Sequence, residues 1–381
     1  MLKKVVSFIC AVILCAASSV PAYAEGEKNL GLSAKSAVLM NADNGQILFA
    51  QDENTKRPMA STTKIMTALL TLEAAQKNNK IVTITDQMVR VEGSSMGLRA
   101  GDRLSLKAIA AGMLTVSGND AANSAAIAIG GSIPAFAELM NQRAKELGLN
   151  DTHFVTPSGL DDDAHYTTAH DLALLAAAAM KNPDFAEIAS NRLMNIQYDN
   201  PSQTRRFTNH NKLLSMYDGC VGVKTGFTKH AGRCLVSAAK RDGIFLIAVT
   251  LNAPDDWNDH EKMLDYGFSS LVNFSLDDSE FSVTLPVVGG VLDKAIVKGT
   301  ATGSLIMDKT DSENIKRVVA LPRFVYAPIQ AGQVVGTVQY ILDGKMVAGT
   351  ELVAAENIAQ YTIPKSGFQI FIENIKKLFT I

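Results

Sequence analysis

The chain has 381 residues, with 36 lysines and arginines against 38 aspartates and glutamates, so its formal net charge is −2. A nearly neutral chain without a concentrated basic stretch excludes nucleic acid as an expected partner. The length exceeds what a single hydrophobic core usually supports and therefore predicts two domains.

Residues 1–24 are typical of a secretory signal peptide. Lys3 and Lys4 form a basic start, residues 5–17 are an apolar run, and Ala22-Tyr23-Ala24 is a small-x-small cleavage site. The apolar run is shorter than the roughly 20 residues that a membrane-spanning helix needs. We therefore expect cleavage after Ala24, which leaves 357 residues with 34 basic and 38 acidic side chains outside the cytoplasm.

Residues 25–275 predict an antiparallel sheet flanked by helices, an α/β architecture of the α+β kind. Strands at 37–40 and 47–49 form a hairpin around Asn44-Gly45, a pair that supplies the positive φ of a tight turn. Strands near both ends of the segment with helices between them favour one sheet. The expected helices span 61–76, 106–130, 133–147, 168–180 and 257–272, and the later strands span 221–224, 234–238 and 244–249.

Residues 276–363 change to short β-rich runs. Examples are 282–287, 317–321 and 334–338, and Asp343-Gly344 predicts a hairpin turn. The segment has no cluster of histidines, cysteines or paired carboxylates. We therefore expect a small all-β domain with a structural role.

Residues 364–381 predict an amphipathic helix, with apolar side chains at three- and four-residue spacing and a net charge of +2. One interpretation is a terminal helix that docks on its own protein or on a partner helix. In an exported chain, a basic helix rich in Phe and Ile favours attachment to a membrane surface instead. The apolar residues are Phe368, Phe371, Ile372, Ile375, Leu378 and Phe379.

Two of the four cysteines, Cys220 and Cys234, lie beyond the signal peptide. An oxidising compartment permits a disulfide bond. If the chain reverses near Lys229, Cys234 lies opposite Lys224, and Cys220 lies four residues, or roughly 13 Å, further along the strand. Because this exceeds the reach of a disulfide, the sequence predicts two buried free thiols.

The Ser-Thr-Thr-Lys motif at 61–64 places a nucleophile beside an amine. Residues three apart at the start of a helix share a face, so Ser61 and Lys64 are expected to meet. A lysine activates a serine only as a neutral amine, and the helix dipole and a second cation, Lys224, are expected to lower its pKa. The other Ser-x-x-Lys copy, Ser237 to Lys240, lies in an expected strand, where residues three apart point to opposite faces.

Two further motifs follow in order. Ser117-Gly118-Asn119 alone is typical of a helix N-cap. Beside the Ser-Lys pair it predicts a proton relay through Ser117 and a substrate-binding amide, Asn119. In Lys224-Thr225-Gly226, the first two residues could bind a substrate carboxylate, and Gly226 lets the substrate approach the strand edge. The backbone N–H groups of Ser61 and Phe227 are the expected oxyanion hole.

These three motifs, in their order and spacing, resemble those of the low-molecular-mass penicillin-binding proteins, and more closely those of the serine D-alanyl-D-alanine carboxypeptidases. The similarity extends through residues 57–64, 93–98 and 218–232 and into the β-rich segment and the amphipathic terminus. It implies the penicillin-binding, β-lactamase-like transpeptidase fold. It also implies removal of the terminal D-alanine from peptidoglycan pentapeptide stems through a Ser61 acyl-enzyme with Lys64 as base, and inhibition by β-lactams.

The chain departs from some relatives at two positions. His210 stands where they have an arginine before an Asn-x-Leu-Leu stretch, and Phe227 replaces a histidine after the glycine. Both departures concern substrate preference more than reaction type. The six histidines show no paired ligand spacing, so no metal and no cofactor are expected.

Other functions fit less well. A class A β-lactamase would add a glutamate that activates the deacylating water, and Glu146 matches that motif literally. However, Gly148 indicates a helix end there, and Gly118 stands where such lactamases carry Asp. A non-catalytic module that binds penicillin or wall peptides is disfavoured because every reactive residue is present. A transpeptidase differs only in its acceptor. The chain is expected to be exported, to the outer face of the cytoplasmic membrane, either membrane-associated or secreted.

Overall fold

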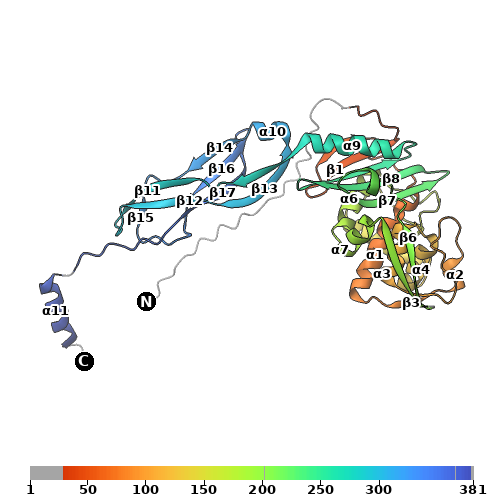
Figure 1. Cartoon of the computed structure of the whole chain (residues 1–381), viewed down its shortest axis with the longest axis horizontal. Helices are drawn as coiled ribbons and strands as arrows, with labels where there is room; N and C mark the ends of the chain where they lie inside the picture. Colours follow the sequence, from red (N-terminus) through yellow and green to blue (C-terminus); the bar gives the residue numbers. More distant parts are fainter. Residues whose placement is uncertain (1–28, 201, 365, 379–381) are drawn as a thin grey trace. The chain divides into compact units, whose positions relative to one another are not determined.

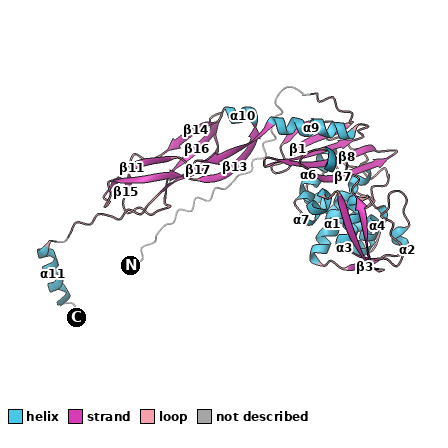
Figure 2. Cartoon of the chain, viewed as in Figure 1, coloured by secondary structure: helices cyan, strands magenta, loops and turns pink. Residues whose placement is uncertain are grey.

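The computed structural model describes residues 29–200, 202–364 and 366–378. The expected signal peptide lies outside these residues. Both helices and strands are found up to helix α9, whereas strands predominate after it (Figure 2).

A five-stranded antiparallel sheet forms the centre of the first part. Its order is β2-β1-β9-β8-β7, so segments far apart in the sequence join where β1 pairs with β9. Every residue of β9 is buried, while β7 lies at the sheet edge. This confirms the predicted hairpin and the predicted antiparallel sheet. The strands are β1 (Ser36–Asn41), β2 (Ile47–Gln51), β7 (Cys220–Thr228), β8 (Gly232–Arg241) and β9 (Ile244–Leu251).

Helices cover both faces of this sheet. Helix α9 lies along one face, and α1, α3 and α4 lie beyond the other (Figure 1). Two small two-stranded antiparallel sheets were not predicted: β3 (Ile81–Thr83) with β4 (Arg103–Ser105), and β5 (Leu193–Asp199) with β6 (Ser202–Thr208). The helices are η1 (Ala60–Thr63), α1 (Lys64–Lys77), α2 (Asp86–Val89), α3 (Leu106–Thr115), α4 (Asn119–Gly130), α5 (Ile133–Glu146), α6 (Ala169–Met180), α7 (Pro183–Ser190), α8 (Leu213–Met216) and α9 (Asp256–Ser270).

The helical pattern predicted over 106–130 is interrupted in the structure. Helix α3 ends at Thr115 and α4 begins at Asn119, because Ser117 adopts a left-handed φ of 60° that a helix cannot continue. The turn exposes the start of α4 to the neighbouring loop. It therefore places Ser117 and Gly118 between the two helices and Asn119 at the first position of α4.

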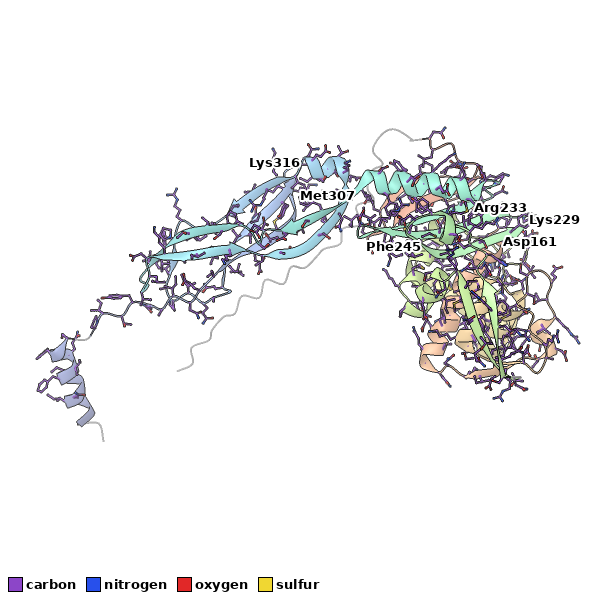
Figure 3. The ribbon with its side chains drawn as sticks, in the orientation of Figure 1. Asp161, Lys229, Arg233, Phe245, Met307 and Lys316 are labelled. Carbon is purple, nitrogen blue, oxygen red and sulfur yellow. The ribbon has the colours of Figure 1, made fainter. Side chains whose placement is uncertain are left out.

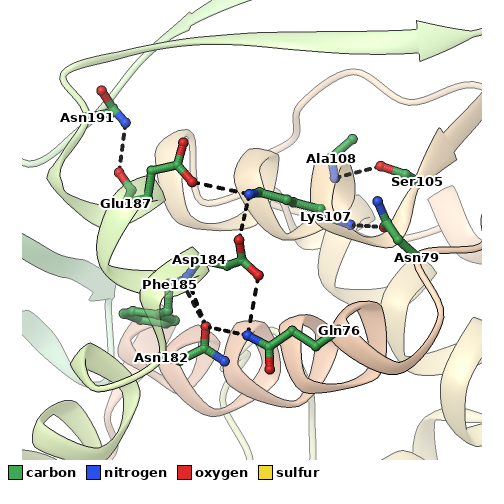
Figure 4. A network of polar contacts seen from close by, with 10 residues as sticks. All are labelled: Gln76, Asn79, Ser105, Lys107, Ala108, Asn182, Asp184, Phe185, Glu187 and Asn191. Atoms are coloured by element: carbon green, nitrogen blue, oxygen red, sulfur yellow. Dashed lines mark hydrogen bonds and ion pairs between the residues drawn. The ribbon is translucent and has the colours of Figure 1, made fainter.

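Helices α1, α3 and α7 are tied together by a polar network (Figure 4). Lys107 on α3 binds Asp184 at 2.6 Å and Glu187 at 3.2 Å, both on α7. Gln76 on α1 donates to Asn182 and Asp184, and Asn182 also caps α7. Side chains from three segments thus fix how these helices pack behind the sheet.

The two cysteines are free thiols, as predicted. Cys234 lies opposite Gly226, two residues from the predicted partner Lys224, because β7 continues to Thr228 before the chain turns. Cys220 lies opposite Ala239, well along the ladder, and is only half-buried. Burial raises the pKa of both thiols, that of Cys234 to about 11.

The second part is a six-stranded sheet, with strand order β14-β16-β17-β12-β11-β15, and a separate β10-β13 pair. Asp343 and Gly344 have φ of 49° and 77° and form the predicted tight turn between β16 and β17. The elements are β10 (Leu271–Asp277), β11 (Ser282–Val288), β12 (Lys294–Gly299), β13 (Ala301–Asp308), α10 (Lys309–Glu313), β14 (Lys316–Ala320), β15 (Val325–Tyr326), β16 (Val334–Leu342) and β17 (Lys345–Ala354).

The predicted terminal helix is α11 (Gly367–Leu378). Its apolar residues Phe368, Ile370 and Phe371 are exposed. No helix among the described residues combines the length and the apolar character needed to cross a membrane.

Candidate active site

The structure brings Ser61 and Lys64 into contact. Ser61 lies in the single turn η1 and Lys64 is the first residue of α1, so their side chains leave the same side of one helical segment. The distance from Lys64 Nζ to Ser61 Oγ is 2.8 Å. The preceding residue, Ala60, has a φ of 48°, a strained conformation that turns the chain sharply into η1.

Lys64 is fully buried and has two further polar partners. Its Nζ donates to Asn119 Oδ1 at 2.7 Å and to the Ser158 carbonyl at 2.6 Å. Burial, followed by the charge of Lys224, lowers the pKa of Lys64 well below its ordinary value. The sequence suggested the Lys224 effect but gave no sign of burial, which is the larger cause.

The hydrogen-bonding geometry defines what a neutral Lys64 does. A neutral amine has two N–H groups and one lone pair. The oxygens of Asn119 and Ser158 can only accept, so they take both N–H groups. The lone pair is then left for the Ser61 hydroxyl, which is the contact that a general base needs.

The second motif supports Lys64 through Asn119. The Asn119 Nδ2 group donates to the Glu92 carbonyl at 2.6 Å, which orients Oδ1 toward Lys64. Ser117 is 5% exposed, and its hydroxyl makes no hydrogen bond with any residue that the structure describes. The structure therefore places Asn119 in the cluster and leaves the Ser117 hydroxyl without a bonded partner in it.

The carboxylate of Asp120 anchors the loop over residues 92–98 beside this motif. It accepts hydrogen bonds from Ser95 Oγ at 2.6 Å and from the backbone N–H groups of Met96 and Leu98 at 3.0 and 2.9 Å. The Asn119 N–H adds a bond to the Ser94 carbonyl. This buried carboxylate, which the sequence did not single out, fixes the loop against the start of α4.

The third motif lies on the edge strand β7. Lys224 is 1% exposed, its Nζ donates to the Thr225 carbonyl at 2.8 Å, and burial lowers its pKa to about 7. A Cβ atom at Gly226 would lie 3.1 Å from the backbone nitrogens of Ser61 and Thr62. A side chain at this position would therefore be tightly packed against the backbone of η1, and glycine leaves this space open. Phe227, the next residue, is 65% exposed.

The loop that follows Ser158 supplies contacts that sequence reasoning missed. Gly159 has a φ of 81°, and a Cβ atom there would lie 1.9 Å from the Ala60 carbonyl oxygen. Thr228, at the end of β7, donates to Asp161 of the same loop at 2.7 Å. In Figure 3, Asp161 and Arg233 lie near the same end of the sheet. No motif marks this loop, because its role rests on backbone atoms.

His165 stabilises the turn η1, which carries the nucleophile Ser61, through a hydrogen bond with Thr63. The backbone N–H of Val155 donates to Nδ1 at 2.9 Å, so the imidazole proton lies on Nε2, which donates to Thr63 Oγ1 at 2.7 Å. Thr63 in turn donates to the Ala60 carbonyl at 2.8 Å. Burial lowers the pKa of His165 to about 4, which keeps the ring neutral. A lone histidine gave no signal in the sequence.

Two further motif matches, at Glu146 and at Ser237 to Lys240, were not expected to take part in catalysis, and the structure shows where their side chains lie. Glu146 ends α5 and bonds to Arg143 at 3.0 Å, and Gly148 has a φ of 74°, which confirms the helix end. No described carboxylate hydrogen-bonds to Ser61 or Lys64. In the strand copy, Ser237 contacts His260 while Lys240 lies over the ring of Phe245, so the two groups do not meet.

His210, the departure from some relatives, lies near the third motif. Its side chain is exposed, yet partial desolvation, followed by the charge of Lys224, lowers its pKa. Its backbone N–H donates to the Thr115 carbonyl at 3.1 Å. Among the described residues, no group of three or more His, Cys, Asp or Glu side chains is arranged to hold a metal ion.

A serine hydroxyl bonded to a buried amine, at the start of a helix packed against the edge of an antiparallel sheet, is the arrangement of a serine acyl-transfer enzyme. A family model described as D-alanyl-D-alanine carboxypeptidase matches residues 23–255, and one described as penicillin-binding protein 5, C-terminal domain, matches residues 277–360. The chain belongs to the D-alanyl-D-alanine carboxypeptidase family of serine peptidases and has its penicillin-binding-protein fold.

Individual relatives agree with this assignment. The chain is 33% identical over 373 residues to the D-alanyl-D-alanine carboxypeptidase DacF of Bacillus subtilis, covering 95% of this chain and 94% of DacF. The crystal structure of the carboxypeptidase DacD from Francisella tularensis matches with a TM-score of 0.63 at 29% identity, covering 88% and 96%. The Streptomyces K15 DD-transpeptidase matches with a TM-score of 0.59 at 33% identity, covering 62% of this chain and 98% of that one.

Proposed function

We propose that this carboxypeptidase acts through an acyl-enzyme on Ser61, and the contact between Ser61 and the buried amine of Lys64 carries the proposal. Lys64 takes the hydroxyl proton while Ser61 Oγ attacks the carbonyl between the two terminal D-alanines of a peptidoglycan stem. The C–N bond then breaks, and the departing amine of D-alanine receives a proton. Water hydrolyses the ester to regenerate the serine.

The edge strand β7 is the proposed substrate platform. Lys224 and Thr225 bind the terminal carboxylate of the substrate, and the missing side chain at Gly226 leaves room for its backbone. The N–H groups of Ser61 and Phe227 stabilise the oxyanion. Support for this oxyanion hole comes from the close approach of β7 to the backbone nitrogen of Ser61.

The roles of the second motif are divided in this proposal. Asn119 orients Lys64, because its amide oxygen already accepts from the lysine amine. Ser117 passes the proton from Lys64 to the leaving amine. Its hydroxyl is available for this relay, since no described residue bonds to it.

The same attack opens a β-lactam ring and leaves a penicilloyl ester on Ser61. A class A β-lactamase would need a carboxylate beside the ester to activate water, but the nearest motif match, Glu146, is bonded to Arg143. We therefore expect a lasting penicilloyl adduct rather than rapid turnover.

The test uses the mature chain and the variant Ser61→Ala. The wild type should release D-alanine from a pentapeptide that ends in D-Ala-D-Ala and should form one adduct with labelled penicillin. The variant should lose both, by a factor of at least about 10³. An adduct that persists in Ser61→Ala, together with no D-alanine release by the wild type, would contradict the mechanism.

We also propose that the chain is exported, through cleavage after Ala24, and attached to the outer face of the cytoplasmic membrane by its terminal helix. The proposed segments are a catalytic domain over 25–275, a β domain over 276–363 and an anchor over 364–381. Exposed Phe368 and Phe371 on α11 support the attachment, because such side chains partition into the interface of a bilayer.

A further inference from the structure

Seven large apolar side chains are exposed around one edge of the six-stranded sheet, where β15 ends the strand order. Clusters of this kind on a soluble domain usually mark an interaction surface. We call this cluster the β11–β15 tip. It consists of Val288, Val291, Leu292, Phe324, Tyr326, Tyr361 and Ile363, whose exposure ranges from 44% to 83%.

Strands β11 and β15 bring the first members together. They run parallel, with Val288 opposite Tyr326, and the Ala327 N–H donates to the Val288 carbonyl at 3.0 Å. The rings of Phe324 and Tyr326 stack edge to face at 5.4 Å. The aromatic side chains are therefore held in a fixed arrangement although they are exposed.

The segment that leaves the β domain completes the tip. The Val291 N–H donates to the Ala359 carbonyl at 2.9 Å, and the Tyr361 N–H donates to the Gly289 carbonyl at 2.8 Å. The chain thus exits beside the loop between β11 and β12 on its way to α11 (Figure 1). Below this surface, Ile329 and Ile358 are buried in a small core, so the tip lies outside a packed layer.

The length of the connection limits how far the tip can lie from α11. Tyr361 is held by its backbone bond, and α11 begins at Gly367. Six residues span at most about 20 Å when fully extended. If α11 lies in the membrane interface, as proposed above, the tip is kept within this distance of the lipid headgroups.

The chemistry of the tip matches that interface. Tyrosine is favoured at the headgroup level because its ring is apolar and its hydroxyl is polar, and the tip presents Tyr326 and Tyr361 among aliphatic side chains. Asp293 in the adjoining loop and Lys294, the first residue of β12, carry opposite charges. Binding of the tip to a bilayer should therefore depend on burial of its apolar side chains rather than on the presence of anionic lipid.

We propose that the β11–β15 tip is a second membrane-contacting surface, which rests on the lipid interface beside the α11 attachment and holds the β domain there. This inference rests on the proposed attachment through α11. It adds a contact made by the folded domain itself.

The first experiment compares binding of the mature chain to vesicles of phosphatidylcholine and phosphatidylglycerol. Replacing Val291, Leu292, Tyr326 and Tyr361 by serine should weaken binding about tenfold, and the loss should persist in vesicles of phosphatidylcholine alone. The matched control replaces exposed apolar residues in β14 and at the start of β17 and should bind like the wild type. The control residues are Val318, Val319, Met346 and Val347.

A second experiment reads the contact directly. In Leu292→Trp, vesicles should shift the added tryptophan emission to shorter wavelength, and brominated lipid should quench it. Met346→Trp, at the start of β17, should show neither change. D-alanine release and the unfolding midpoint should match the wild type in every variant, because these side chains are exposed and lie outside the catalytic cluster.

The outcomes separate the two proposals. One set of results would reject the inference alone: the wild-type chain binds vesicles, the double variant Phe368→Ser with Phe371→Ser does not bind, and the tip variants bind as well as the wild type. Attachment through α11 would then stand. If the wild type does not bind vesicles at all, both fail. A shift of the Leu292→Trp emission that grows with protein concentration without vesicles would overturn the inference in favour of self-association.

Discussion

Two lysines are buried in the active site, and neither forms an ion pair with a described carboxylate. Lys64 is fully buried and Lys224 is 1% exposed. An ammonium group removed from water without a counterion is costly, so both residues release their protons more readily than a surface lysine. Protein packing thus supplies a neutral amine at Lys64, the form that can accept the Ser61 proton.

We predict that Lys224→Met moves the acid limb of Ser61 acylation to higher pH, by up to about one unit. A positive neighbour disfavours protonation of Lys64, so its removal raises the pKa of Lys64, and the base becomes protonated at a higher pH. The shift of the acid limb should be seen below about pH 7, where Lys224 carries a positive charge. Acylation should also slow about tenfold or more through loss of the carboxylate contact.

The measurement is the second-order rate of acylation by a fluorescent penicillin between pH 5 and pH 9, a range that brackets the Lys224 pKa of about 7. Lys224→Arg is the control, since it keeps the charge and should leave the acid limb in place. An unchanged limb in Lys224→Met would show that Lys224 does not act on Lys64.

Gly159→Ala should destabilise the protein by more than about 3 kcal/mol and impair acylation. Its Cβ would lie 1.9 Å from the Ala60 carbonyl, so the strained turn before Ser61 must move. Gly148→Ala is a matched control, because Gly148 has a similar φ of 74° with no atom within 4 Å, and it should cost only about 1 kcal/mol. Urea unfolding measures both, and equal losses would rule out the clash.

At the scale of elements, short polar ties set how helices pack around the site. Lys107 is 40% exposed, which limits the strength of its ion pairs with α7. The hydrogen bond from Lys107 is the largest cause that lowers the pKa of Asp184. Because the folded protein depresses this pKa, the pair contributes stability above the ordinary pKa of aspartate and loses it as the pH falls below.

Lys107→Met should therefore reduce the free energy of unfolding by up to about 1 kcal/mol at pH 7 in low salt. The difference from the wild type should shrink as the pH falls below the ordinary pKa of aspartate and Asp184 becomes protonated. Urea titrations at several pH values measure it, with the exposed lysine variant Lys181→Met as control. A loss that stays constant down to pH 3 would mean that packing of the Lys107 stem, not charge, ties α3 to α7.

At the scale of the whole molecule, the catalytic residues and the apolar helix belong to different parts of the chain. The cluster around Ser61 is built from η1, α4, β7 and the loop at Ser158. Helix α11 contributes none of these contacts. Catalysis and attachment should therefore be separable.

A chain that ends at Ile363 should leave the membrane fraction and release D-alanine at the wild-type rate. The physical reason is that Phe368, Phe371 and their neighbours provide the apolar surface for attachment. Fractionation of cells and an assay on the purified truncated chain measure the two properties. Retention in the membrane fraction would show that α11 is not needed for attachment.

The sequence by itself determined the strands of the main sheet, most of the long helices and the reacting groups. Short apolar runs separated by turn residues predicted the hairpin at 36–51 and the three late strands, and the spacing of three between Ser61 and Lys64 predicted their meeting, because both features depend on the local sequence. The break between α3 and α4 was less clear, since one residue with a left-handed backbone interrupts an otherwise helical pattern.

Only the tertiary structure decided how the amine is kept neutral and how the nucleophile turn is held. The Ser158 carbonyl, the space at Gly159 and the ring of His165 act through contacts across about a hundred residues, and backbone atoms leave no trace in residue type. Burial of Lys64 likewise depends on every element that covers it. The reacting groups can therefore be predicted from the sequence, whereas desolvation and close packing arise only when distant segments meet.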